Sequence, residues 1–289
     1  MKREEIMKRS VIAIISGMML VAGLVSCDKL DEPYAVKKTG GDTATGMVRK
    51  VLLEDYTGHK CVNCPEAALV ARALEETFPG QVIVMAVHAG YFAEPSATGD
   101  FTADYTSATG NEWNTYFNIV ANPNGMVNRT PAGAPVLGPE QWVNAVSEQL
   151  SLPQEANIGI SNHYNTSSRL LEIEVEAKFL YALQGTYNLT VCITEDSLVS
   201  PQKNNNPNIG LPTPIIYDYV FMDVLRGSVN GTWGEELTTA ADTSVTYSRT
   251  FSFNLDPDWN ADFCHVVAFI SNASDHQIIQ AEKKAVISE

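Results

Sequence analysis

The first half of the chain alternates between apolar runs and one amphipathic stretch. Residues 48–56 and 81–88 are strand-like, and the second run is almost continuously apolar, as is typical of a strand buried on both faces. Between them, residues 66–77 carry an apolar stripe at helical spacing, and Pro65 suits the first turn of that helix because it lacks a backbone N–H donor. The pattern predicts a strand, a helix and a buried parallel strand, which together form a βαβ unit.

Weaker signals follow in the same half. Residues 125–129 predict a short strand after a proline, and residues 139–150 predict a closing helix. The insertion between residues 91 and 118 is rich in Thr, Ala and aromatic residues, and we expect it either to pack against the sheet or to shape a substrate groove.

The second half consists of short strand-like segments separated by polar turns. In residues 170–179, apolar side chains alternate with Glu and Lys, which indicates a half-buried strand. Similar segments lie at residues 157–162, 186–194, 217–225, 244–255 and 264–271. Many short strands with polar turns predict a β-sandwich of the immunoglobulin-like type, and residues 200–216, rich in Asn and Pro, predict a long loop.

The N-terminus has the pattern of an export signal. Residues 1–10 carry four basic residues, and the uncharged stretch at residues 11–25 is too short for a membrane span of roughly 20 residues. Its end, Leu24-Val25-Ser26-Cys27, resembles a bacterial lipobox, which implies cleavage before Cys27 and acylation of that residue. We expect residues 1–26 to be a lipoprotein signal peptide and residues 27–46 a lipid-anchored tether; the alternative is a plain signal peptide with a chance cysteine.

Composition and charge narrow the classes of function. Hydrophobic residues make up 45% of the 289 residues and charged residues 18%, which supplies enough apolar material for a sizeable core. The formal net charge of −15 repels phosphate backbones, so we expect no nucleic-acid partner.

Two cysteines at Cys-x-x-Cys spacing, Cys61 and Cys64, lie directly before the predicted helix. A helix N-terminus offers unpaired N–H groups and a partial positive charge that stabilise a thiolate, and a cationic His59 or Lys60 would add to this effect. Because the thiolate is the attacking species, Cys61 is the candidate nucleophile. Cys64, one turn later, would then resolve the mixed disulfide.

In this arrangement residues 48–152 resemble the thioredoxin superfamily. The resemblance implies that Asp55, six residues before Cys61, is a buried acid that shuttles a proton to or from Cys64. It also implies that Asn122 and Pro123 form the cis-proline loop that holds a substrate backbone beside the sulfurs. The alternatives are that Asp55 is a surface strand residue and that Pro123 is an ordinary turn proline.

Other uses of the cysteines stay open. The Cys-x-x-Cys pair is also half of a zinc site, but Cys192 and Cys264 do not form the second close pair that a structural site commonly needs, and we expect no metal or cofactor. A permanently oxidised, inert disulfide is the stronger alternative, because an exported protein meets oxidising conditions. Cys192 and Cys264 lie in predicted strand centres, where they either pair with each other or act as small hydrophobes.

Across its length the chain resembles the Bacteroidetes outer-membrane lipoprotein family related to outer membrane protein twenty-eight. The run EDYTGHKCVNCP at residues 54–65 carries the resemblance most specifically, and PNGMVNR at residues 123–129 supports it. The resemblance implies an α/β thioredoxin-like domain at residues 47–153, followed by an all-β immunoglobulin-like sandwich domain at residues 154–289. It also implies a lipid anchor in the outer membrane, with the periplasmic and surface-exposed faces both open.

Two classes of function follow from these residues. One is thiol–disulfide exchange with a protein thiol or disulfide substrate, in which Cys61, Cys64 and Asp55 are catalytic and Asn122 and Pro123 bind the substrate. The other is a non-enzymatic surface lipoprotein that binds a ligand, a host component or an outer-membrane transporter partner, with a structural 61–64 disulfide. The fold alone does not choose between them.

Overall fold

The computed structural model describes residues 48–210 and 214–287. Cys27, the predicted signal peptide and the predicted tether lie outside these residues. All of the described residues fall within one compact unit.

Helices and strands alternate in the first half of the described chain, and strands dominate the second. The first half contains β1 (Val51–Thr57), α2 (Cys64–Thr77), β2 (Val82–His88), α3 (Ala108–Tyr116), β3 (Asn124–Val127) and α4 (Pro139–Ser151). The second half contains β4 (Ala156–Asn165), β5 (Leu170–Phe179), β6 (Gln184–Glu195), β7 (Leu198–Lys203), β8 (Ile215–Phe221), β9 (Val224–Ser228), β10 (Glu235–Ala240), β11 (Thr246–Asn254), η1 (Ala261–Phe263), β12 (Cys264–Asn272) and β13 (Ile278–Ala285).

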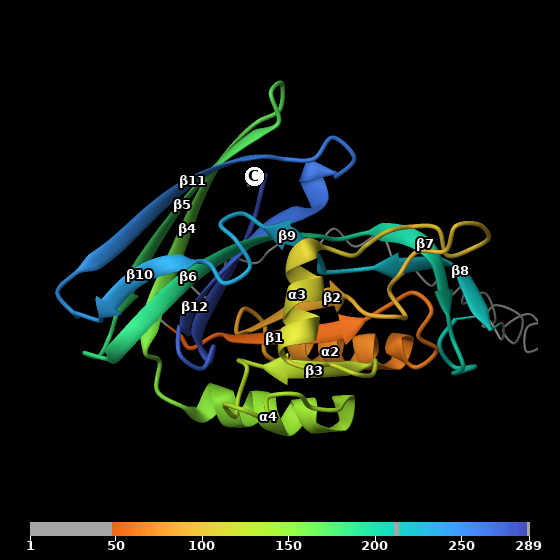
Figure 1. Cartoon of the computed structure of the whole chain (residues 1–289), viewed down its shortest axis with the longest axis horizontal. Coiled ribbons are helices and arrows are strands. Elements are labelled where there is room, and N and C mark those ends of the chain that lie inside the picture. The colour runs from red at the N-terminus through yellow and green to blue at the C-terminus, as the bar shows by residue number, and fades with distance from the viewer. Residues whose placement is uncertain (1–47, 211–213, 288–289) are drawn as a thin grey trace, which may run out of the picture. The chain divides into compact units, whose positions relative to one another are not determined.

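The alternation of side chains along β1 assigns its two faces to different cores. Val51 and Leu53 pack into the core that lies under α2 and α4, whereas Leu52 and Tyr56 pack into the core on the α3 side. The helices accordingly cover different faces of the sheet (Figure 1). By the same alternation, Asp55 belongs to the face of β1 that packs against α2.

One large sheet runs through both halves of the described chain. Its strands lie in the order β13-β12-β6-β9-β2-β1-β3, and β10 pairs with β6. Strand β1 is parallel to β2 and antiparallel to β3. Strand β9 joins the halves, because it pairs with both β2 and β6. The boundary predicted at residue 153 falls in the connection between α4 and β4, and the sheet continues across it.

A second sheet, ordered β11-β5-β4, packs against the large sheet. The predicted alternation of β5 is confirmed, because Leu171, Ile173 and Val175 are buried while the Glu residues between them are exposed. These apolar side chains share a core with Val191 of β6 and Val266 of β12. The described chain is therefore mostly β-sheet, with two packed sheets in its second half.

Residues 198–221 differ from the prediction of a long loop. Strands β7 and β8 form an antiparallel hairpin that pairs Leu198 with Phe221 and Lys203 with Ile215. Pro201 argues against a strand, but the pairing is irregular at this position, and a bulge tolerates a residue without an N–H donor. The predicted strand at 217–225 is also interrupted, since Asp223 has φ of 57° between β8 and β9.

The sequence does not predict helix α3 within the 91–118 insertion. Its sequence has little apolar periodicity, yet Ser107 caps its start by accepting a hydrogen bond from the Gly110 N–H at 3.0 Å. Trp113 anchors it in the core with no exposed surface. Burial of one large aromatic side chain thus offsets weak helix propensity.

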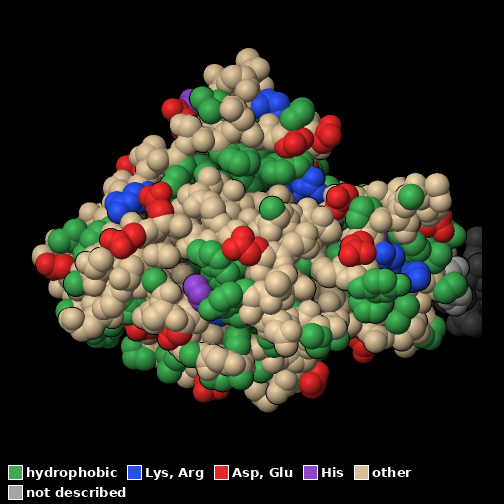
Figure 2. Space-filling model, in the orientation of Figure 1, with side chains coloured by type: hydrophobic (Ala, Val, Ile, Leu, Met, Phe, Trp, Pro, Cys, Tyr) green, Lys and Arg blue, Asp and Glu red, His purple; other side chains and the backbone are tan. Residues whose placement is uncertain are grey.

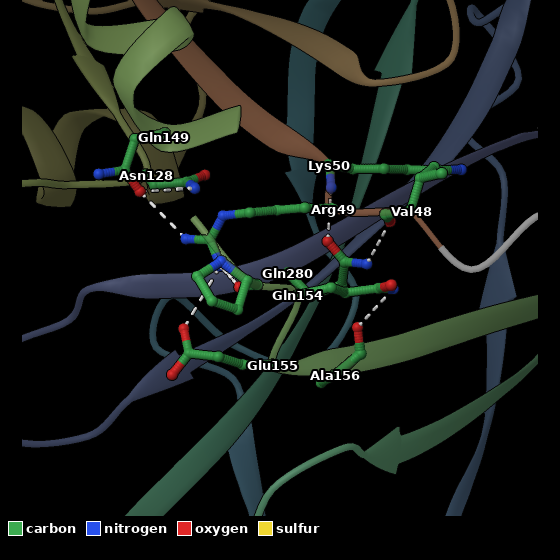
Figure 3. A network of polar contacts seen from close by, with 10 residues as sticks. Val48, Arg49, Lys50, Asn128, Gln149, Gln154, Glu155, Ala156 and Gln280 are labelled. Carbon is green, nitrogen blue, oxygen red and sulfur yellow. Dashed lines mark hydrogen bonds and ion pairs between the residues drawn. The ribbon is translucent and has the colours of Figure 1, made fainter. Parts of the chain in front are cut away.

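A polar network ties the start of β1 to the connection before β4 and to β13 (Figure 3). The Arg49 guanidinium donates to Pro153 O at 2.9 Å and to Gln149 Oε1 at 3.1 Å. Gln280 of β13 accepts a hydrogen bond from the Lys50 N–H at 2.8 Å. These bonds join segments that are about a hundred or more residues apart in sequence.

Cys192 and Cys264 do not form a disulfide. Both thiols are free and buried, and they belong to different cores. Burial raises the pKa of each thiol to about 12, so both stay protonated at neutral pH. Of the two uses left open by the sequence, the structure favours small buried hydrophobes.

Candidate functional site

Cys61 and Cys64 are joined by a disulfide at the start of α2, with their Cα atoms 5.5 Å apart. Cys64 is the first residue of the helix, Asn63 is its N-cap, and Pro65 occupies the first turn, as the sequence predicts. Cys61 and Cys64 are each only 2% exposed. The bond therefore lies at a helix N-terminus but beneath a cover of other residues.

The loop at residues 58–63 carries Cys61 from the end of β1 to α2. The Cys61 N–H donates to Gly58 O at 2.9 Å, and the Lys60 N–H donates to Phe92 O at 3.0 Å. A side chain at Gly58 would lie 2.6 Å from the backbone N of Ala93. The loop is thus packed directly against the insertion that follows β2, at a distance that only glycine allows.

Asp55 is buried in the middle of β1, and its Oδ1 atom has no hydrogen-bond partner among the described residues. Burial raises the pKa of Asp55 from 3.8 to about 7. Side-chain alternation directs it toward α2, the helix that begins at Cys64. A carboxyl with this pKa is able to give or take a proton near neutral pH.

The expected cationic role of His59 is wrong. Its ring is buried, stacks on Phe101 at a centroid distance of 5.5 Å, and lies with Nε2 3.3 Å from Glu94 O. Burial lowers the pKa of His59 below its ordinary value, so the ring is neutral at pH 7. Lys60 stays partly exposed, with its Nζ atom 5.3 Å from the centroid of the Tyr91 ring.

Asn122 and Pro123 are joined by a cis peptide bond directly before β3. Strand β3 pairs Asn124 with Tyr56, so Pro123 lies beside the end of β1 from which the cysteine loop departs. Both residues are half-buried, and Asn122 Nδ2 donates to Ala89 O at 3.5 Å. The sheet register thus brings this proline loop to the same edge of the sheet as the cysteines.

The C-terminal half contributes a part of the site that the sequence did not reveal. Residues 202–205, here called the strap, run alongside the cysteine loop. The Lys203 N–H donates to His59 O at 2.8 Å, and the Asn205 N–H donates to Val62 O at 3.1 Å. The Asn and Pro content of residues 200–216 predicts a long loop, but no local pattern indicates contact with residues about 140 positions earlier in the chain.

His88, at the end of β2, is paired in register with Thr57. It is fully buried, and neither ring nitrogen has a hydrogen-bond partner among the described residues. The ring packs against Tyr105 of the insertion and Phe221 of β8. His88 therefore joins the sheet edge, the insertion and the β7–β8 hairpin through aromatic packing, while burial lowers its pKa to about 3.

A pocket lies beside α3, and none of its lining residues belongs to the cysteine loop or to the strap. It is lined by Asn111, Glu112, Thr115, Tyr116 and Trp233, and Trp233 Nε1 donates to Glu112 Oε1 at 2.8 Å. Figure 2 shows acidic side chains scattered over the face on which α3 lies, rather than gathered in one place. Within the described ranges, no group of three or more His, Cys, Asp or Glu residues is arranged to hold a metal ion.

The comparisons with known proteins place the chain in a family of outer-membrane proteins. Residues 110–289 match the family described as outer membrane protein Omp28, which is more than half of the chain. The chain therefore belongs to the Omp28 family, and its location is the outer membrane. No curated protein matches it.

Solved structures add a likeness in fold. Protein AGR_C_4864 from Agrobacterium tumefaciens is 13% identical with a TM-score of 0.50, and the match covers 84% of this chain and 96% of that one. A domain of the outer membrane lipoprotein Omp28 from Porphyromonas gingivalis is 18% identical with a TM-score of 0.32, over 47% of this chain and 92% of that one. None of the helices in the described residues has the length and apolar character required to cross a membrane.

Proposed function

We propose that this outer-membrane protein performs thiol–disulfide exchange through Cys61 and Cys64. The observation that carries the proposal is the position of the disulfide at the N-terminus of α2, with Asp55 buried on the strand face that packs against the same helix. Asn122 and Pro123 lie at the same edge of the sheet and supply a backbone against which a substrate segment binds.

The exchange begins when a substrate thiolate attacks the Cys61 sulfur. A new bond forms between these two sulfurs, the Cys61–Cys64 bond breaks, and Cys64 leaves as a thiolate that takes the proton of Asp55. A second substrate thiolate then attacks the substrate sulfur of the mixed disulfide and releases Cys61 as a thiolate, which takes a proton from water. The substrate loses two electrons and becomes a disulfide, while the protein pair gains them and becomes a dithiol. In the reverse direction Cys61 is the nucleophile and Cys64 resolves the mixed disulfide.

The arrangement of strands and helices around the cysteines is consistent with thiol–disulfide exchange. A thioredoxin-like domain at residues 47–153 is supported by β1 lying parallel to β2 and antiparallel to β3, with a helix that starts at the second cysteine. An immunoglobulin-like sandwich at residues 154–289 is supported by the two packed sheets. One large sheet is shared by the two proposed parts, because β9 pairs with β2 of the first part and with β6 of the second.

A lipid anchor at Cys27 would hold this unit at the membrane, after removal of residues 1–26 and with residues 27–46 as a tether. The lipobox-like sequence and the family of outer-membrane proteins support it. Replacement Cys27→Ser is expected to abolish labelling by radioactive palmitate and to release the protein from the membrane fraction. Unchanged labelling would place the acyl chain elsewhere.

The exchange proposal is tested by the reduction potential of the 61–64 pair and by a Cys64→Ser variant. A potential above about −250 mV is expected for an exchanging pair, whereas one below about −300 mV marks a structural bond. Cys64→Ser should accumulate mixed disulfides on Cys61, and the double variant Cys61→Ser/Cys64→Ser should accumulate none. Equal capture by the two variants would contradict the proposal.

A second function is favoured by the burial of the disulfide. Because both cysteines are 2% exposed, the bond also suits a structural role in a non-enzymatic lipoprotein that binds a ligand, a host component or an outer-membrane transporter partner. This alternative predicts a reduction potential below about −300 mV and no mixed disulfides on Cys61 in the Cys64→Ser variant.

A further inference from the structure

The strap is bonded to the cysteine loop by side chain as well as by backbone. Gln202 Nε2 donates to Cys61 O at 2.7 Å and to Lys203 O at 2.8 Å. Asn205 Nδ2 donates to Asn63 Oδ1 at 2.7 Å. The residues between β1 and α2 are therefore fixed by a segment of the C-terminal half as well as by their own turn.

Gln202 is buried, so water cannot replace the hydrogen bonds that its side chain makes. Its side chain is 1% exposed, so water does not reach the Cys61 carbonyl in its place. A buried acceptor that loses its donor costs its full desolvation penalty, which exceeds the net worth of an ordinary hydrogen bond. The amide of Gln202 thus holds the backbone of Cys61 firmly while the strap stays docked.

We propose that Gln202 is a positioning residue for the cysteine pair and that the strap is an intramolecular cover that restricts access to it. The proposal rests on the proposed function, because it describes how that exchange site is regulated. Holding the Cys61 backbone keeps its sulfur against Cys64 and favours the disulfide over the dithiol. By linkage, the oxidised pair favours the docked strap, and reduction favours its release.

Because the two cysteines are buried, the docked strap should slow any reaction of the disulfide with a thiol. A thiol reagent must approach one sulfur along the axis of the bond, and two cysteines that are each 2% exposed offer no such approach while the strap is docked. Exchange at this site therefore follows opening of the strap. A protein substrate with an extended segment is able to take over the backbone hydrogen bonds that the strap makes to His59 O and Val62 O.

The test compares two buried glutamines in the full chain. Gln280 is 3% exposed, accepts from the Lys50 N–H at 2.8 Å and donates to Val48 O at 3.0 Å, so Gln280→Leu removes similar bonds from a different part of the large sheet. The disulfide is reduced with dithiothreitol under native conditions, and the new thiols are counted by maleimide labelling over time. Dithiothreitol loses two electrons and becomes a cyclic disulfide, while Cys61 and Cys64 gain the electrons and two protons.

Gln202→Leu is expected to accelerate reduction at least fivefold and to shift the equilibrium with dithiothreitol toward the dithiol by about five- to a hundredfold, the range of the desolvation penalty of one buried acceptor that has lost its donor. Gln280→Leu should lower the melting temperature without changing either quantity. Asn205→Ala, at an exposed position that does not endanger folding, should accelerate reduction to a smaller degree.

Two results would overturn the proposal. One is reduction at the wild-type rate in Asn205→Ala and in Gln202→Leu, or in Asn205→Ala alone if Gln202→Leu does not fold. The other is equal acceleration in Gln280→Leu, which would assign the effect to general destabilisation. Because dithiothreitol needs no natural partner, these outcomes are independent of whether Cys64→Ser traps a substrate.

Discussion

Arg129 donates two hydrogen bonds to the carboxylate of Glu54, from Nε at 2.9 Å and from Nη2 at 2.8 Å, and both side chains are buried. Glu54 lies in β1 directly before Asp55, and Arg129 follows β3. The Arg129 guanidinium also lies 4.6 Å from the centroid of the Trp113 ring. This ion pair therefore joins the strand that leads to the cysteines, the strand that follows the proline loop, and α3.

Removing one member of this ion pair should destabilise the fold strongly. Arg129→Met is expected to lower the free energy of unfolding by about 3–5 kcal/mol, because it leaves the Glu54 carboxylate buried without a partner. Glu54→Leu should have a similar cost, and the double variant should lose less than the sum of the two. Urea unfolding of the four proteins measures this coupling, and strictly additive losses would show that the pair does not interact.

The raised pKa of Asp55 predicts a pH dependence of stability. Between pH 4 and pH 7 the folded protein keeps this proton while the unfolded chain, with its pKa near 3.8, loses it. Stability is therefore lost as the pH rises through this window, and the loss is complete above about pH 7.

Asp55→Asn removes this titration and is expected to be more stable than wild type at pH 8. The gain should be a few kcal/mol at pH 8 and should vanish at pH 4, where the folded protein keeps the proton of Asp55. Urea unfolding at pH 4, 6 and 8 tests it, with the exposed Asp258→Asn as the control. A gain that is equal at all three values would rule out titration of Asp55 as the cause.

The parts of the fold that the sequence predicts well are those with local causes. The apolar runs of β1 and β2, the stripe and proline of α2, and the alternation in β5 all act within one element, and the structure has each of them. The position of the cysteines at a helix N-terminus follows from the same local signals.

The parts that escaped prediction depend on contacts between distant residues. Helix α3 is held by burial of Trp113, and the β7–β8 hairpin forms despite Pro201 because its pairing is irregular there. The hydrogen bond from Gln202 to Cys61 O joins residues that are 141 positions apart, and no sequence pattern in either segment predicts it. Residue type alone predicts a cationic His59, whereas burial against the insertion keeps its ring neutral.

The buried His88 predicts sensitivity to acid. Burial lowers its pKa from 6.5 to about 3, so the unfolded chain binds a proton between these values while the folded protein does not. Stability should therefore fall as the pH falls from about 6.5 toward 3. His88→Leu is expected to lose less of its melting temperature between pH 7 and pH 4.5 than wild type does. Replacement of the exposed His163 by Leu is the control, and an equal decline in all three proteins would contradict the prediction.

Gly58 gives a test of the packing between the cysteine loop and the insertion. A Cβ atom at this position would meet the backbone of Phe92 and lie 2.6 Å from the N of Ala93, and backbone atoms cannot turn aside as a flexible side chain can. Gly58→Ala is therefore expected to lower the free energy of unfolding by about 1–3 kcal/mol, the usual cost of overpacking. Because the Lys60 N–H of the cysteine loop donates to Phe92 O of the insertion, displacing the insertion should also loosen this loop and speed reduction of the disulfide by dithiothreitol. Gly159→Ala is the matched control, since a Cβ there meets nothing within 4 Å, and it should change neither quantity. If Gly58→Ala and Gly159→Ala have the same free energy of unfolding and the same rate of reduction, the close approach of these two loops does not stabilise the site.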